Sequence, residues 1–194
     1  MQKNRVHKMM AVAILAAMGV VLQLVSFPVI PGFNYLKIDF SDIPVMMSLF
    51  LYGPMAGVAT AFIRSLVHLA MTGFSLDNLI GDGASFLATI MFTMPMFFFF
   101  KKQTNTKRNK VLGVFSGILL MTVFMSIANY FVLTPLYLKI LGWPLGMALE
   151  RYILVAIVPF NLVKGSIVSV VFLVLHARLL PWLTRQQKYI GETI

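Results

Sequence analysis

The sequence predicts an all-helical protein embedded in a membrane, and three observations support this fold class. Of the 194 residues, 59% are hydrophobic and only 11% are charged, and the mean hydropathy is +0.88. The apolar residues fall in runs that approach the roughly 20 residues a bilayer-spanning helix needs. The sequence lacks strand-like alternation, so helices are the remaining way to satisfy backbone groups in lipid. We therefore expect one membrane-embedded substrate-binding domain over residues 1–194.

The first apolar run extends from Met9 to Phe27 and follows a basic start. Such a start is also typical of a secretory signal peptide, but this run is long, lacks a convincing cleavage site and precedes further spans. Ala13 and Ala17 are four residues apart and form a ridge of small side chains that lets another helix approach closely. From spacing alone, packing within the same bundle is the favoured interpretation of this ridge.

A polar loop over 28–42 leads to the second and third runs. Within the loop, 37–40 alternates as a short extended segment does, and Asp42 is placed to cap the next helix. The run 43–52 is short for a span, which indicates a tilted helix or a locally thinned bilayer. The run 55–72 begins after a Gly-Pro turn and is the third expected span.

Two ionisable residues interrupt the third run. Arg64 and His68 are four residues apart and so share one helix face. They could line a cavity, but an internal ion pair with carboxylates is the favoured interpretation. A lone histidine without a second ligand nearby is weak evidence for a metal, and we predict no metal site.

The second half of the chain continues the pattern. A polar break over 73–83 precedes the fourth run, which ends in four phenylalanines. The loop 101–110 is basic and contains no acid, and the fifth run, 111–133, opens on a GxxxG helix-packing motif. A loop over 136–151 then leads to the sixth run, 152–180.

The distribution of charge predicts the orientation of these six spans. Eleven of the sixteen basic residues lie in the two ends and the 101–110 loop, and three lie in the opposite loops. This asymmetry places both termini in the cytoplasm. The same flanking distribution argues against nucleic acid as the target of the net charge of +10. P-loop, serine-hydrolase and zinc-protease motifs are missing, so we expect no enzyme activity, and any uphill transport would draw its energy from a partner.

The segment Pro159–Gly165 lies inside the sixth run and carries the most informative polar residues. A lysine at such depth costs roughly 2.5 to 3.5 kcal/mol, so Lys164 should face the protein interior or a wet cavity. Asn161 is three residues earlier and lies on the same helix face. Together with Asn129, near the outer end of the fifth run, these side chains predict an outward-facing polar site for a small, partly planar ligand. The alternative is that Lys164 snorkels to an interface while Asn161 bonds a neighbouring helix.

Four stretches, taken together, resemble one known family. They occur in the family's order over most of the chain, and they are 37–44, 78–82, 129–137 and 159–165. The chain is similar to the S-components of energy-coupling-factor (ECF) vitamin transporters, specifically the riboflavin-binding (RibU) group. The resemblance implies a six-helix subunit of the bacterial cytoplasmic membrane that captures riboflavin from outside and carries no cofactor of its own.

The resemblance also implies roles for individual residues. The polar edge of the flavin ring would meet Asn129, Asn161 and Lys164, and flavin mononucleotide (FMN) could also bind. The outer loops would close over the ligand through Asp42, Ile43, Leu79, Gly81 and Asp82. Ala13 and Ala17 would dock on the transmembrane coupling subunit EcfT, and two ATPase subunits would complete the complex.

Two alternatives remain at this point. The same fold could be specific for another vitamin. A membrane enzyme could instead use Arg64, His68 and the outer acids as acid–base groups.

Overall fold

The computed structural model describes residues 2–101, 107–142 and 145–192. Within them the chain is largely helical, with one short hairpin. The elements are α1 (Gln2–Leu24), β1 (Phe27–Pro28), β2 (Lys37–Ile38), α2 (Asp42–Tyr52), α3 (Pro54–Thr72), α4 (Leu76–Phe100), α5 (Lys107–Ala128), η1 (Asn129–Leu133), α6 (Thr134–Leu141), α7 (Leu149–Tyr152), η2 (Ile153–Ile157) and α8 (Val158–Glu192).

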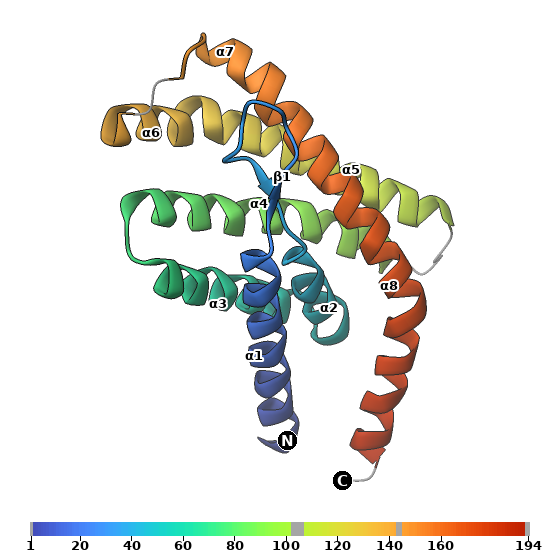
Figure 1. Cartoon of the computed structure of the whole chain (residues 1–194). Helices are drawn as coiled ribbons and strands as arrows, with labels where there is room; N and C mark the ends of the chain where they lie inside the picture. Colours follow the sequence, from blue (N-terminus) through green and yellow to red (C-terminus); the bar gives the residue numbers. More distant parts are fainter. Residues whose placement is uncertain (1, 102–106, 143–144, 193–194) are drawn as a thin grey trace.

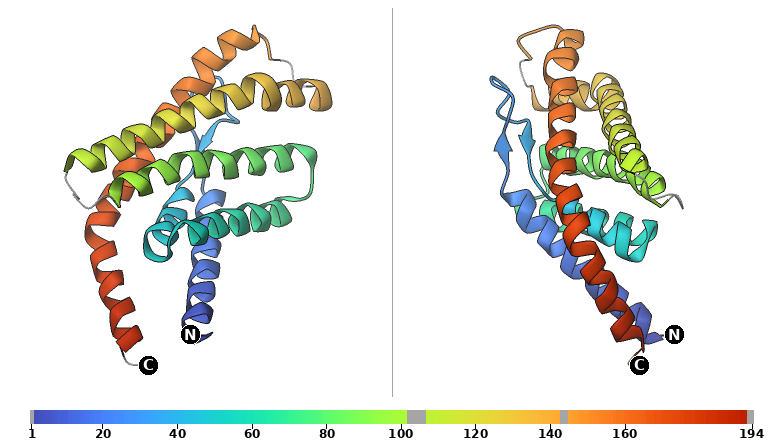
Figure 2. Two further views of the ribbon diagram at one scale, coloured as in Figure 1. Left: turned by 180° about the vertical axis from the view of Figure 1, so that it is seen from behind. Right: turned by 90° about the vertical axis from the view of Figure 1, so that its right-hand side faces the viewer.

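The helices form a bundle whose two termini lie at the same end. In Figure 1, α4 and α5 run side by side, and α8 crosses them before descending to the same end of the molecule as α1. Figure 2 shows the same arrangement from behind and from the side, with both termini at the bottom. The β1–β2 hairpin and the α3–α4 connection lie away from the termini. This arrangement leaves several polar connections together at one end of the bundle.

The predicted six-helix organisation is confirmed. Five helical segments within the described residues are long and apolar enough to cross a membrane. The sixth, Asp42–Tyr52, is apolar but shorter, as expected from its run of residues. Part of the predicted basic loop, residues 102–106, lies outside the described residues.

The core lies where α2, α4, α5 and α8 meet. Phe92, Met96 and Phe172 are each at most 1% exposed and belong to one continuous apolar cluster. Gly117 makes the close approach of α5 to α4 possible, because a Cβ there would lie 2.5 Å from the carbonyl oxygen of Phe92. Gly113 meets the Phe100 ring in the same way. The GxxxG motif of the fifth run is therefore a helix-packing contact.

Both π-helical turns lie directly before a proline. η1 ends two residues before Pro135, and η2 ends two residues before Pro159. Proline lacks an N–H and crowds the preceding turn, so the helix widens locally instead of ending. The predicted loop over 136–151 is therefore wrong at both its ends, because the helix runs on to Leu141 and resumes at Leu149.

The β1–β2 hairpin and the start of α2 connect the first helix to the rest of the bundle. The predicted extended segment is confirmed, since Phe27 pairs with Ile38 in antiparallel register. The capping role expected of Asp42 is wrong. Ser41 occupies the N-cap position without a side-chain cap bond, and the Asp42 carboxylate accepts hydrogen bonds from Arg64 and Thr89 instead.

Candidate functional site

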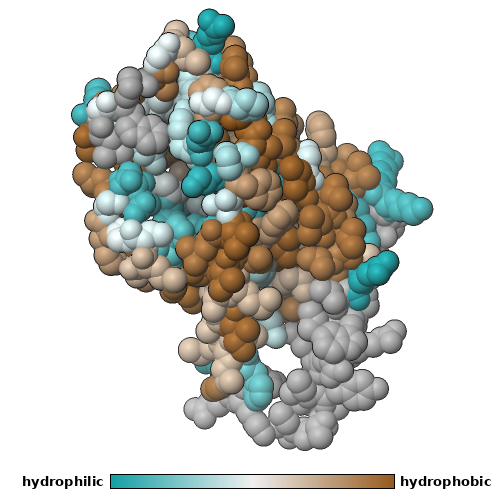
Figure 3. Space-filling view, in the orientation of Figure 1, coloured by the Kyte–Doolittle hydropathy of each residue, from teal (hydrophilic) through white to brown (hydrophobic). Residues whose placement is uncertain are grey.

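A cavity of about 750 Å³ lies among the polar connections at the end of the bundle remote from the termini. Residues from α1, the hairpin region, α3, α4, α5, η1, α6, α7, η2 and α8 line it. Its walls combine apolar and aromatic side chains, which are Phe33, Tyr35, Leu36, Met125, Leu133, Tyr137, Leu138, Leu145, Tyr152, Ile157 and Phe160. Figure 3 shows hydrophilic residues gathered at the upper left, above a broad apolar surface. The volume and lining are typical of small-molecule sites.

The three polar residues predicted for the site all line this cavity. Asn129 donates to the backbone carbonyl of Met125 at 2.8 Å, and Asn161 donates to that of Ile157 at 2.8 Å. A carboxamide has two N–H donors, so each side chain keeps a second N–H after this bond. Each residue lies at one of the two π-helical turns: Asn129 opens η1, and Asn161 bonds the last residue of η2. The local helix geometry therefore sets both amide orientations.

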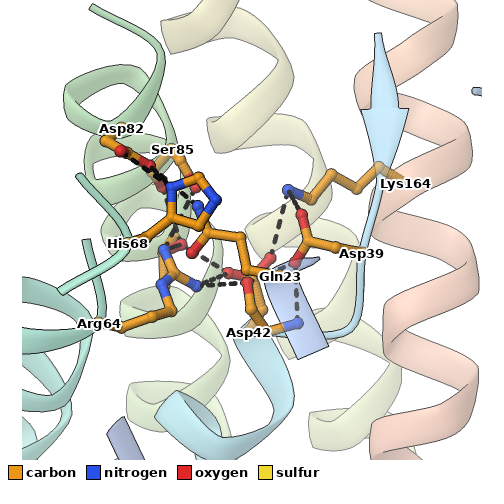
Figure 4. A network of polar contacts seen from close by, with 10 residues as sticks. Gln23, Asp39, Asp42, Arg64, His68, Asp82, Ser85 and Lys164 are labelled. Atoms are coloured by element: carbon orange, nitrogen blue, oxygen red, sulfur yellow. Dashed lines mark hydrogen bonds and ion pairs between the residues drawn. The ribbon is translucent and has the colours of Figure 1, made fainter. Parts of the chain in front are cut away.

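Lys164 faces the interior, so the interfacial alternative for it is wrong. The residue is 7% exposed, and its ammonium lies 3.8 Å from Asp39 Oδ2 and 3.7 Å from Asp42 Oδ2 (Figure 4). The cost of burying this charge is offset by two carboxylates, as expected of an ionisable group at membrane depth. One of these carboxylates, that of Asp39, belongs to a residue that lines the cavity.

Arg64 supports the site from behind the cavity wall. Its guanidinium is fully buried and donates to Asp42 Oδ1 at 3.0 Å and to Ser41 Oγ at 2.8 Å. It also donates to Thr89 Oγ1 at 3.0 Å and to Ser85 Oγ at 3.3 Å. The predicted internal ion pair is confirmed, and it links α2, α3 and α4.

His68 forms a second pair that lies at the cavity itself. Its Nδ1 lies 2.8 Å and 3.0 Å from the two oxygens of Asp82, and Gln23 Nε2 donates to Asp82 Oδ1 at 2.9 Å. All three side chains line the cavity, and Figure 4 shows this group on the opposite side from Lys164. His68 and Asp82 therefore contribute polar groups to the cavity on the side opposite Lys164.

Of the five loop residues predicted to contact the ligand, two line the cavity and three do not. Gly81 and Asp82 line the cavity. Asp42 is 1% exposed and lies behind the wall, where it contacts Arg64 and Lys164. Ile43 packs in the core cluster, and Leu79 lines a separate apolar groove on the outer face of α4. The last three side chains therefore do not line the cavity.

Several cavity residues escaped the prediction from sequence. Gln23 is a lone polar residue near the end of an apolar run, and that isolation was its only signal. Tyr152 and Tyr35 approach each other with ring centroids 6.5 Å apart, although they are far apart in sequence. Nothing local in either segment indicates that contact.

The predicted small-residue ridge faces away from the bundle. Ala13 and Ala17 are exposed, whereas Val12, Ala16 and Val20 form the buried face of α1. Packing within the same bundle, which the spacing alone favoured, is therefore the wrong interpretation of the ridge.

These features define a membrane-embedded binding protein for a small molecule. Consistent with this class, the family model for the substrate-specific component of ECF transporters matches residues 7–176. The chain belongs to this family and is thus the substrate-binding subunit of an ECF importer and not an enzyme. It is a multi-pass protein of the bacterial cell membrane.

Individual relatives agree with the family assignment. The chain is 36% identical to the riboflavin transporter FmnP of Bacillus subtilis, over 94% of this chain and 97% of the relative. It is 34% identical to the riboflavin transporter RibU of Staphylococcus aureus, over 95% of each protein. A solved structure of the S component of a bacterial ECF transporter superposes with a TM-score of 0.77 at 32% identity, covering 92% of this chain and 98% of that one.

Proposed function

We propose that this chain captures riboflavin from outside the cell and delivers it to a separate energy-coupling module. The observation that carries the proposal is the convergence of Asn129, Asn161 and Lys164 on one cavity of about 750 Å³. Relatives named as riboflavin transporters align with nearly the whole chain and support the choice of ligand.

The chemistry of the cavity suits a flavin ring. One edge of the ring carries carbonyl oxygens on both sides of an N–H, so it needs donors and an acceptor together. The Lys164 ammonium supplies donors, and each asparagine carboxamide supplies both kinds of group. The aromatic and aliphatic walls, including Phe160 and Leu133, then cover the ring faces. FMN carries the same ring and would use the same contacts.

The proposed orientation has both termini in the cytoplasm and the cavity on the outer side. The termini and the cavity lie at opposite ends of the bundle, as this orientation requires. In this orientation Gly81 and Asp82 would contact the ligand from the outer end of α4. Ile43, Leu79 and Asp42 would support the lid around the ligand instead of touching it.

We propose that the exposed ridge of α1 docks on a partner subunit. Ala13 and Ala17 present a small-residue surface that no other described helix of this chain covers, and such surfaces let helices approach closely in lipid. The proposed partner is the transmembrane coupling subunit EcfT, with two ATPase subunits supplying the energy. An S-component has no nucleotide-binding motif of its own, which fits this division of roles.

The binding proposal is tested on protein purified from cells grown with riboflavin. The purified protein should be yellow and should release a flavin on denaturation. The Asn161→Ala variant should bind riboflavin at least about tenfold more weakly, because a buried carboxamide is lost at the ring edge. A colourless protein that also fails to bind added riboflavin would refute the proposal.

A further inference from the structure

Arg64 lies behind the cavity wall, and its ion pair with Asp42 links it to the cavity residue Lys164. We propose that Arg64 is a positioning residue: it holds Asp42 so that the Lys164 ammonium keeps its N–H groups for the ligand. This inference rests on the proposed function, because Lys164 must contact the bound molecule. It adds a residue that does not line the cavity to the set that determines affinity.

Arg64 has the burial and contacts of a fixed support. Its side chain is 0% exposed, and its two terminal nitrogens donate to residues of α2, α4 and the loop before α2. The planar guanidinium presents its donors in a rigid fork, so four acceptors around it fix one orientation. Gly19 of α1 leaves room for this side chain, because a Cβ there would lie 3.1 Å from Arg64 Cδ.

The two carboxylates near Lys164 divide their oxygens between the framework and the cavity. Asp42 Oδ1 accepts from Arg64 at 3.0 Å and from Thr89 at 2.5 Å, and Asp42 Oδ2 faces Lys164. Asp39 Oδ1 accepts from the backbone N–H of Ser41 at 2.8 Å and from the Ser41 hydroxyl, and Asp39 Oδ2 faces Lys164. Figure 4 shows this order of contacts from Arg64 to Lys164. Neither acid is therefore free to turn fully toward the ammonium.

The distances from Lys164 show the result of this division. They are 3.8 Å and 3.7 Å, longer than the roughly 2.7–2.9 Å of a charge-assisted hydrogen bond. The ammonium is thus held by attraction while its donors stay available to a ligand. Within the described residues, Lys164, Arg64 and the two acids form a group of two cations and two anions.

Loss of the Arg64 fork should change this balance in a defined direction. Asp42 Oδ1 would lose its cation, and the carboxylate would turn toward the remaining positive charge. Lys164 would then bond the acid directly, and the ligand would have to displace that bond. Preorganised side chains avoid this cost, which is why supporting residues affect affinity.

The test is a double-mutant cycle on riboflavin affinity, measured by titration calorimetry on the purified full chain. Arg64→Lys keeps the charge but loses the fork, and it is made in the wild type and in Lys164→Met. We expect Arg64→Lys to weaken binding at least about fivefold in the wild type and to change it by less than about twofold in Lys164→Met. A role in folding alone would weaken binding equally in both backgrounds.

A second variant keeps the test decisive if Arg64→Lys does not fold. Thr89→Val removes the hydroxyl between Arg64 and Asp42 without removing a charge, and Thr93→Val is the matched control one turn further along α4. Both threonines are 1% exposed. Thr89→Val should weaken binding only when Lys164 is present, and Thr93→Val should leave affinity unchanged. An equal loss of riboflavin affinity in the wild-type and Lys164→Met backgrounds, or no loss in either, would overturn the inference. A wild type that binds no riboflavin would instead overturn the proposed function.

Discussion

Replacement of Lys164 by methionine is the sharpest perturbation of the site, because it has two separable effects. Methionine preserves the apolar stem and removes the ammonium, which lies within 4 Å of Asp39 and Asp42. The lysine side chain is only 9% exposed, so water screens its charge weakly. Breaking a buried pair of this kind costs about 3–5 kcal/mol, since an uncompensated charge remains. For a chain of this size that corresponds to a fall in Tm of roughly 6–20 °C.

The second effect is on the ligand. Loss of the donors should weaken riboflavin binding at least about tenfold, or 1.4 kcal/mol. Adding Asp39→Asn to Lys164→Met restores the charge balance, and the amide oxygen can still accept from the Ser41 N–H. The double variant should therefore recover most of the lost Tm but not the affinity.

The two effects are read by thermal unfolding and by titration calorimetry on the same preparations. Affinity that returns together with the Tm would show that Lys164 acts only on stability. An unchanged affinity in Lys164→Met alone would refute the assignment of the ammonium to the ligand.

Two further predictions concern helix packing and docking. Gly117→Ala should destabilise the protein by about 1–3 kcal/mol, because the added Cβ would lie 2.5 Å from the Phe92 carbonyl oxygen. The control is Gly83→Ala, where a Cβ meets nothing within 4 Å, and equal Tm values for the two variants would show that Gly117 is not needed for helix packing. Ala13→Leu and Ala17→Leu should preserve riboflavin binding and abolish uptake in cells that carry the coupling module. Ala11→Leu is the control outside the ridge, and normal uptake in the ridge variants would show that the ridge does not dock on the coupling subunit.

The helices were predictable because the membrane imposes a strong constraint on sequence. Every backbone group in lipid must be satisfied within the chain, so long apolar runs become helices. The continuation of the helix past Pro135 to Leu141 and the widened turns before Pro135 and Pro159 were not predictable, because a proline in a single sequence indicates only a break or kink in the helix. A neighbouring packed helix and a widened turn accommodate them here.

The central polar residues of the cavity were predictable for a similar reason. Lys164 and Asn161 are conspicuous in an apolar run because lipid penalises them. The particular pairs of polar residues around the cavity were not predictable. Arg64 contacts Asp42 from 22 residues away, and Gln23 contacts Asp82 from 59 residues away. Ile43 and Leu79 lie close in sequence to residues of the site, but their side chains point into the core and the outer groove. Proximity along a helix does not decide which face a side chain occupies.

We propose that Asn129, Asn161 and Lys164 form a riboflavin site. Titration calorimetry of the purified, flavin-free chain with riboflavin and with thiamine tests it most directly. We expect saturable binding of riboflavin at one site per chain and no measurable heat with thiamine. Binding of thiamine in preference to riboflavin, or of neither, would show that these residues do not form a riboflavin site.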